Sequence, residues 1–108
     1  MRNGPTYLLI GTKLYTDTLV LRAVLEGLST QARHWGETIV ILGNESLPGL
    51  DHEVEAFKYL AYQYVKSWPK CNIVIAFMDD LRHNRQTQEW LEQAKGDGIP
   101  AFVISTYH

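Results

Sequence analysis

Residues 72–77 read NIVIAF, a continuous apolar run rich in β-branched side chains. Three further runs have the same character, at 7–10 (YLLI), 38–42 (TIVIL) and 101–104 (AFVI). None of them alternates with polar residues, which is typical of strands that are buried on both faces of a parallel sheet. We therefore expect four strands with helices covering both faces of the sheet.

Three segments with helical spacing separate these runs. The first begins after Thr16 or Asp17, the second after Asp51 and the third after Asn84, and all four residues are good helix caps. Apolar side chains recur at three- and four-residue steps in each segment. Their positions are Leu21, Val24, Leu25, Leu28 and Ala32, then Val54, Phe57, Ala61, Tyr64 and Val65, then Thr87, Trp90, Leu91 and Ala94. The alternation predicts a three-layer α/β sandwich of Rossmann-like type, with a mainly parallel four-stranded sheet and three main helices.

Length and composition indicate one domain spanning residues 1–108, since 108 residues with 45% hydrophobic side chains suffice for one core. A single cysteine, Cys71, excludes an internal disulfide. The formal charge of −2 argues against strong nucleic-acid binding. No apolar run approaches the roughly 20 residues that span a bilayer, and no segment reads as a secretion signal. We expect a cytoplasmic protein without a membrane partner.

Ligands of open parallel sheets bind at the carboxyl ends of the strands, where backbone N–H groups and helix amino ends converge. Three segments are expected at this edge: 11–17 (GTKLYTD), 43–51 (GNESLPGLD) and 78–87 (MDDLRHNRQT). Together they hold three glycines and three cations, namely Gly11, Gly43, Gly49, Lys13, Arg82 and Arg85. Glycine lets a backbone approach a phosphate and a cation balances its charge, although glycine also simply turns a chain after a strand.

Several of these segments are similar to one family. Residues 10–17 (IGTKLYTD) resemble the opening of the YspA/YpsA-related branch of the SLOG superfamily, where a strand runs into Gly-Ser/Thr-Arg, an aromatic residue and Asp. Residues 43–51 resemble the family's glycine-rich turn into a helix. Toward its end, the family has a strand, an Arg-Gly-Thr loop, a Gly-Ile-Pro turn and a final strand. This chain resembles these four features, in the same order, at residues 72–77, 85–87, 98–100 and 102–104.

This resemblance implies a Rossmann-like domain that binds nucleotides or nucleotide-derived ligands, and some relatives hydrolyse the N-glycosidic bond of nucleoside monophosphates. The positions that match the family's loops are Gly11, Thr12, Lys13, Gly43, Gly49, Asp51, Arg85 and Thr87. Asn44, Ser46 and Arg82 belong to the same loops, and Tyr15 takes the aromatic position, where it would stack on a base or pack in the core. We predict these twelve residues to bind the ligand.

The chain departs from the family in its loops. The 43–49 loop (GNESLPG) lacks the central glycines, Gln86 replaces the glycine before the threonine, and 79–83 (DDLRH) replaces the Pro-Gly-Gly signature of the hydrolases. Relative to the family, we also expect a strand and its connections to be missing between Asp51 and Asn72. These differences indicate a reduced ligand-binding core.

Two carboxylates are candidates for catalysis. Glu45 and Asp79 fall at the ligand edge and could act as general acid or base on a glycosidic bond. Asp79 and Asp80 together could hold a hydrated Mg²⁺, but aspartates at a strand end more often are solvated or cap a helix. His52 and Glu55 supply only two ligands of the three or four that a metal site needs, so we expect no metal and no cofactor.

The expected function is binding of a small nucleotide or nucleotide-derived ligand, without robust catalysis. Two alternatives stay open: a phosphoribohydrolase-like N-glycosidase that acts on nucleoside monophosphates, and a small phage or accessory protein that binds a host protein. Tyr59 and Tyr62 fall off the apolar stripe of the second helical segment, and together with Trp68 they suggest a subunit contact, as in a homodimer.

Overall fold

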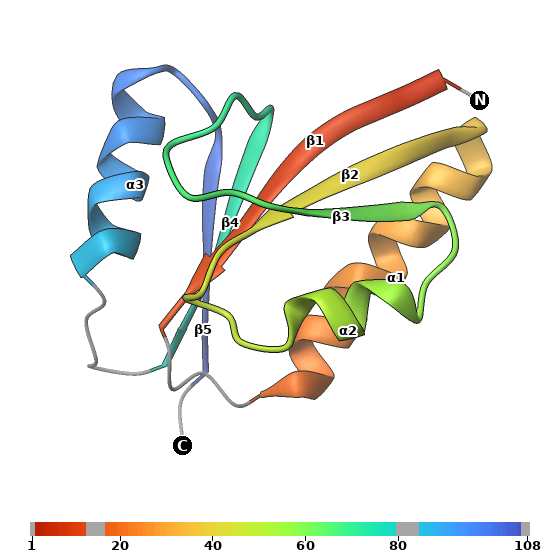
Figure 1. Ribbon diagram of the computed structural model, residues 1–108, viewed down its shortest axis with the longest axis horizontal. Coiled ribbons are helices and arrows are strands. Elements are labelled where there is room, and N and C mark those ends of the chain that lie inside the picture. The colour runs from red at the N-terminus through yellow and green to blue at the C-terminus, as the bar shows by residue number, and fades with distance from the viewer. Residues whose placement is uncertain (1, 13–16, 80–84, 107–108) are drawn as a thin grey trace.

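A computed structural model describes residues 2–12, 17–79 and 85–106 (Figure 1). In this part of the chain, five parallel strands form one sheet in the order β3-β2-β1-β4-β5, accompanied by three helices. The elements in chain order are β1 (Arg2–Gly11), α1 (Thr18–Trp35), β2 (Glu37–Gly43), α2 (Leu50–Glu55), β3 (Leu60–Tyr64), β4 (Ile73–Asp79), α3 (Arg85–Gly96) and β5 (Ala101–Thr106). The predicted Rossmann-like α/β sandwich is confirmed, but the sheet has five strands and not four.

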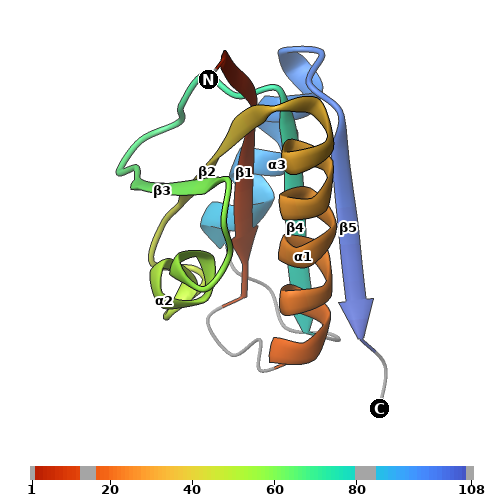
Figure 2. The same cartoon turned by 90° about the vertical axis from the view of Figure 1, so that its right-hand side faces the viewer.

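The helices lie on both faces of the sheet, with α1 and α2 on one face and α3 on the other (Figures 1 and 2). Side chains along β1 alternate between the two faces: Leu9 packs under α1 and α2, whereas Leu8 and Ile10 pack under α3. All three side chains have no exposed surface. An uninterrupted apolar run is therefore needed, because polar residues on either face would be buried without partners.

The first and third predicted helices are confirmed. Asp17 caps α1, since its carboxylate accepts a hydrogen bond of 3.2 Å from the Val20 N–H. Gly36 ends this helix in the left-handed conformation, with φ of 66°, which glycine adopts without strain. In α3 the predicted stripe faces the sheet, where Thr87, Trp90 and Ala94 are buried.

The second predicted helix is wrong beyond residue 55. Helix α2 ends at Glu55, and residues 60–64 (LAYQY) form β3, which pairs with β2 in the register Ile41↔Tyr62. The strand expected to be absent between Asp51 and Asn72 is therefore present. Apolar side chains at 60, 62 and 64 fit a two-residue period, and tyrosine favours strands, so this segment satisfies the strand pattern as well as the helical one.

The connection from β3 to β4 contains no helix. Val65, Trp68 and Cys71 from this connection pack instead against the cluster beneath α3. The Trp68 and Trp90 rings meet edge to face, with centroids 5.8 Å apart and planes at 77°. The connection thus covers part of the sheet face that a crossover helix would otherwise cover.

None of the helices in the ranges described above is long and apolar enough to cross a bilayer.

Candidate functional site

The carboxyl ends of β1 and β4 lie side by side at the point where the chain changes direction across the sheet. From β1 the chain proceeds through β2 to β3, and it then returns to β4 on the other side of β1. Gly11 ends β1 and Asp79 ends β4. Such a switch point is where open parallel sheets bind ligands. The predicted residues Lys13, Tyr15 and Arg82, and the side chain of Asp79, lie outside the part of the chain that the structure describes.

A buried hydrogen-bond network joins the loops at this edge. The Ser46 hydroxyl accepts a 3.0 Å hydrogen bond from the Gly11 N–H and donates to Asn44 Oδ1. The same Asn44 oxygen accepts from the Ser46 N–H at 2.9 Å. From the other side, the Thr87 hydroxyl donates a 2.7 Å hydrogen bond to the Gly11 carbonyl. The structure therefore brings together Gly11, Asn44, Ser46 and Thr87, as predicted residues of one site.

The side chains in this network point into the protein. Ser46 is fully buried, Thr87 is 1% exposed and Asn44 is 5% exposed. Asn44 Nδ2 also donates to Gln86 Oε1 at 3.4 Å, so the start of α3 contacts the loop after β2. Because these polar groups bond to one another, they hold the strand ends in place from within.

Two of the predicted glycines are required by close packing. A Cβ atom on Gly11 would lie 2.5 Å from the Phe77 carbonyl oxygen, and one on Gly43 would lie 2.6 Å from Leu50 Cδ2. Neither residue has a positive φ. Gly49 differs, since its φ of 83° is in the left-handed region and it occupies the N-cap of α2. The glycines therefore differ in what they provide: close contact at Gly11 and Gly43, and backbone conformation at Gly49.

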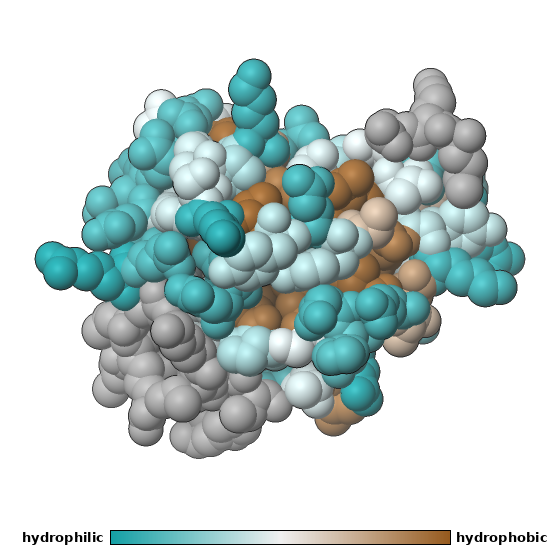
Figure 3. Space-filling view, in the orientation of Figure 1, coloured by the Kyte–Doolittle hydropathy of each residue, from teal (hydrophilic) through white to brown (hydrophobic). Residues whose placement is uncertain are grey.

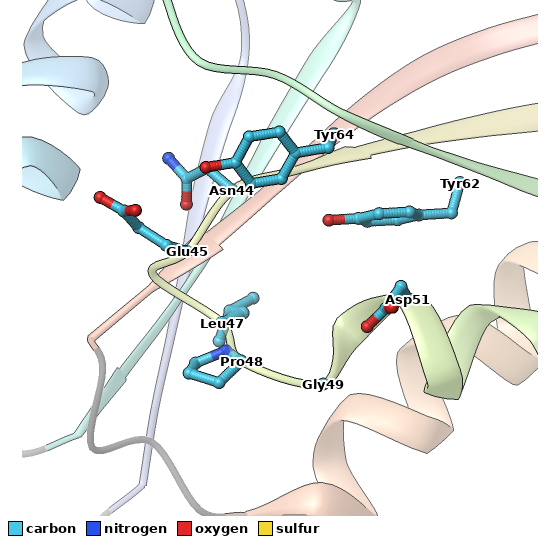
Figure 4. A pocket seen from close by; sticks show the side chains of 8 residues that line it. All are labelled: Asn44, Glu45, Leu47, Pro48, Gly49, Asp51, Tyr62 and Tyr64. Carbon is cyan, nitrogen blue, oxygen red and sulfur yellow. The ribbon is translucent and has the colours of Figure 1, made fainter.

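A pocket of about 280 Å³ opens beyond the carboxyl ends of β2 and β3 (Figure 4). It is lined by residues of the loop after β2, the start of α2, and β3. These residues are Asn44, Glu45, Leu47, Pro48, Gly49, Asp51, Tyr62 and Tyr64. The predicted residues Asn44, Glu45, Gly49 and Asp51 thus share one cavity, whereas Gly11, Gly43, Ser46, Arg85 and Thr87 do not line it.

The two tyrosines of this pocket were not predicted as ligand residues. Tyr62 and Tyr64 stand two positions apart on β3, so they project from the same face of the strand. Reading 60–64 as helix hid this relationship. The signal in the sequence was the Tyr-Gln-Tyr alternation itself, which places two aromatic rings on one face only if the segment is a strand.

The electrostatics of the pocket are acidic. Glu45 and Asp51 are exposed, and the pocket lining includes no lysine, arginine or histidine among the described residues. Burial raises the pKa of the Tyr62 phenol above its usual value, and the nearby charge of Asp51 raises it further. Tyr62 therefore keeps its proton and can donate a hydrogen bond.

Arg85 is placed at the start of α3 with a fully solvated side chain. Its guanidinium lies 3.8 Å from the Glu89 carboxylate, one helical turn further on. Since the Arg85 side chain is 94% exposed, this pairing is weak and leaves the guanidinium accessible from solvent.

The described residues were compared with what a metal site and a reactive thiol require. No group of three or more His, Cys, Asp or Glu side chains gathers there in a way that could hold a metal ion. Burial raises the pKa of the Cys71 thiol, and Asp97 adds to the shift. A raised pKa lowers the thiolate fraction at neutral pH, as expected of an unreactive cysteine.

The fold and pocket define an all-parallel α/β protein with an acidic, tyrosine-lined cavity at the ligand edge of its sheet. The chain matches no protein-family model, and no curated protein or solved structure shows significant similarity to it. Its function is therefore argued from the geometry of this edge and from the residues at it.

Proposed function

We propose that this protein binds a small nucleotide or nucleotide-derived ligand at the carboxyl edge of its sheet. The observation that carries the proposal is the pocket beyond the carboxyl ends of β2 and β3, at the same edge of the sheet as the β1–β4 switch point. Open parallel sheets bind nucleotides at this edge. The resemblance of the first and third loops to the SLOG superfamily supports the same class of ligand.

The residues at this edge divide into two chemical groups. The predicted cations Lys13, Arg82 and Arg85 belong to the loops after β1 and β4, and would balance a phosphate. The two tyrosines lie in the pocket, where aromatic rings suit the part of the ligand that carries no phosphate.

A thermal-shift panel of mononucleotides, dinucleotides and cyclic nucleotides, applied to the purified chain, tests the proposal. A ligand present at about 100 times its Kd stabilises the folded state by about 2.7 kcal/mol. We expect one member to raise the melting temperature, and Lys13→Ala and Arg85→Ala to abolish the rise. Lys95→Ala is the matched control, because Lys95 is exposed in the last turn of α3. If no member of the panel stabilises the protein, the proposal fails.

An enzymatic variant of the proposal makes Glu45 a general acid or base in N-glycosidic cleavage. Glu45 is the carboxylate that both falls in the predicted loop and lines the pocket next to Asn44. Chromatography of nucleoside monophosphates after incubation with high protein concentrations would detect released base. Release that is lost in Glu45→Gln favours the enzyme, and intact substrates throughout favour binding alone.

A second candidate function is protein binding through β5, with a second copy of the chain as the partner. Strand β5 is an edge of the sheet, its residues 101–106 carry no charge, and Phe102 and Val103 are 57% and 55% exposed. These two side chains point to opposite faces, so neither face of the edge is protected. Uncharged, exposed edge strands pair readily, and two copies of one strand can pair antiparallel about a two-fold axis.

Sedimentation velocity distinguishes a dimer from a monomer. We expect the wild-type chain to sediment as a dimer and Val103→Lys as a monomer, because a charge at an edge opposes strand pairing. Lys58→Glu, at an exposed site next to the opposite edge strand, should leave the dimer intact. A wild-type monomer at high concentration would rule out the second copy as partner.

A further inference from the structure

The negative charge of the acidic pocket indicates the charge of the ligand that it can hold. This relationship does not depend on nucleotide binding. Its two ionisable carboxylates, on Glu45 and Asp51, lie on opposite sides of the cavity (Figure 4). Neither Arg22, which is paired with Glu53 at 2.8 Å, nor His52 lines the pocket. A phosphate in this cavity would meet negative charge without compensation, whereas a cation would be attracted.

The aromatic side chains of β3 add a second, independent attraction for a cation. Figure 4 shows the Tyr62 and Tyr64 rings projecting from β3 over the loop that carries Glu45, with Asp51 below Tyr62. Tyr64 is 48% exposed, so much of its ring remains open to a ligand. The faces of aromatic rings are negative, and they hold ammonium groups in aromatic cages.

The walls of the pocket are packed against the ends of the strands. Helix α2 begins beside the cavity, where Leu50 lies against Gly43 and Asp51 lines the pocket with Tyr62. Leu47 forms an apolar wall of the pocket. Its side chain is buried and lies against Gly11, since a Cβ atom on Gly11 would be 2.6 Å from Leu47 Cδ2. Tyr62 is held in turn against Gly43, since a Cβ atom there would lie 2.9 Å from its ring. The walls are thus positioned before a ligand arrives, which lowers the entropic cost of binding.

We infer that this pocket binds an organic cation, a quaternary or protonated amine, between the β3 tyrosines and the carboxylates of Glu45 and Asp51. The apolar walls of Leu47 and Pro48 suit the carbon groups attached to such a nitrogen. Phosphate is excluded from this cavity, and any phosphate of a nucleotide lies at the switch point instead.

Choline and its neutral isostere 3,3-dimethyl-1-butanol have nearly the same shape, but only choline is charged. Comparing how tightly the two bind therefore measures the contribution of the charge. In an NMR titration of the purified chain, we expect choline to shift the ring resonances of Tyr62 and Tyr64. The neutral isostere should bind about tenfold more weakly or not at all, because it lacks the charge that the rings and carboxylates attract. Inorganic phosphate should leave these resonances unchanged.

Matched variants assign the effect to the pocket. Glu45→Gln and Tyr64→Leu should each weaken choline binding by about three- to tenfold. Tyr64→Phe retains an aromatic face and should retain most of the affinity, which separates loss of the ring from loss of the fold. Glu55→Gln, an exposed carboxylate on α2 outside the pocket, should have no effect.

Three results would overturn the inference: equal binding of the isostere, phosphate-induced shifts at the two tyrosines, or no choline-induced shift at about 50 mM, a range that reveals millimolar Kd values. Failure of nucleotide binding is distinguishable from all three. Lys13→Ala, which tests the phosphate-binding loop, should leave the choline titration unchanged.

Discussion

The Thr87 hydroxyl, in the first turn of α3, donates a hydrogen bond of 2.7 Å to the carbonyl oxygen of Gly11, 76 positions earlier at the end of β1. Ser46, from the loop after β2, binds the N–H of the same glycine. Both backbone polar groups of one strand-end residue are thus held by side chains from two other segments. This arrangement fixes the ligand edge of the sheet from its interior.

Removal of the Thr87 hydroxyl should destabilise the protein. Thr87→Val keeps the shape but leaves the buried Gly11 carbonyl without this donor, at a cost of about 1–3 kcal/mol. Thr87→Ser keeps the hydroxyl and should recover most of the stability. Urea denaturation measures both, and equal stability of Thr87→Val and wild type would contradict the structural role of this bond.

Gly11 should not tolerate a side chain. In Gly11→Ala the new methyl group would meet the Phe77 carbonyl, a backbone atom of a central strand that cannot move cheaply, so we expect a loss of about 1–3 kcal/mol. Gly27→Ala is the control, since Gly27 is inside α1 with no atom within 4 Å of an added Cβ. That change should stabilise the helix by about 0.5–1 kcal/mol. Thermal denaturation of the two variants should therefore shift in opposite directions.

The Arg22–Glu53 pair should make stability depend on pH. Its hydrogen bond, 2.8 Å long, joins α1 to α2 and lowers the pKa of Glu53 below the ordinary glutamate value. A lowered pKa in the folded state means that the stabilisation is present above the unfolded-state pKa and is lost as pH falls through the folded-state pKa. Glu53→Gln should thus be less stable than wild type at pH 7, with a difference that shrinks under acid conditions. Because the pair is largely exposed, the difference should also shrink in high salt. Denaturation curves at several pH values would show a constant difference if the pair does not contribute.

Trp68 should contribute to stability although it belongs to a connection. Its indole N–H donates to Asp97 at 2.9 Å, and its ring packs on Trp90. Trp68→Ala would uncover the α3 face of the sheet and should cost about 2–3 kcal/mol, less than a fully buried tryptophan. Trp35→Ala is the comparison, since Trp35 is 53% exposed and should cost less than about 1 kcal/mol. Similar losses in the two variants would mean that the connection does not cover the core.

Figure 3 shows apolar groups between polar side chains across the face where β3 crosses the view. The connection after β3 contains no helix, and its Trp68 packs against the cluster beneath α3 instead.

Residues 54–65 explain why part of the fold was mispredicted. Apolar side chains at 54, 57, 61, 64 and 65 satisfy a helical period, while those at 60, 62 and 64 satisfy a strand period. Local pattern alone does not choose between them. Pairing with β2 does choose, because Tyr62 extends the sheet beside Ile41 and its ring packs over Gly43.

The candidate site was predictable in position and less so in composition. Glycines and polar residues after apolar runs located the carboxyl edge, and Asn44, Glu45, Gly49 and Asp51 do share a pocket there. Ser46 and Thr87 were predicted as ligand residues from the same pattern, and the structure places their hydroxyls in internal hydrogen bonds. Side-chain direction at a strand end depends on neighbouring loops, which a single sequence does not reveal.

Apolar runs such as NIVIAF, separated by segments with helical spacing, predict a parallel α/β sheet, because runs without polar interruption suit strands that are covered on both faces. The run at the edge strand β5 differs, since Phe102 and Val103 are exposed. Local periodicity also predicts the presence of α1 and α3, and Asp17 is one of the two caps expected for α1. Tertiary pairing was needed to place residues 60–64 in the sheet and to bring Tyr62 and Tyr64 into one pocket with Glu45 and Asp51. Those outcomes depend on pairing between segments distant in the chain, whose free energy no local pattern contains.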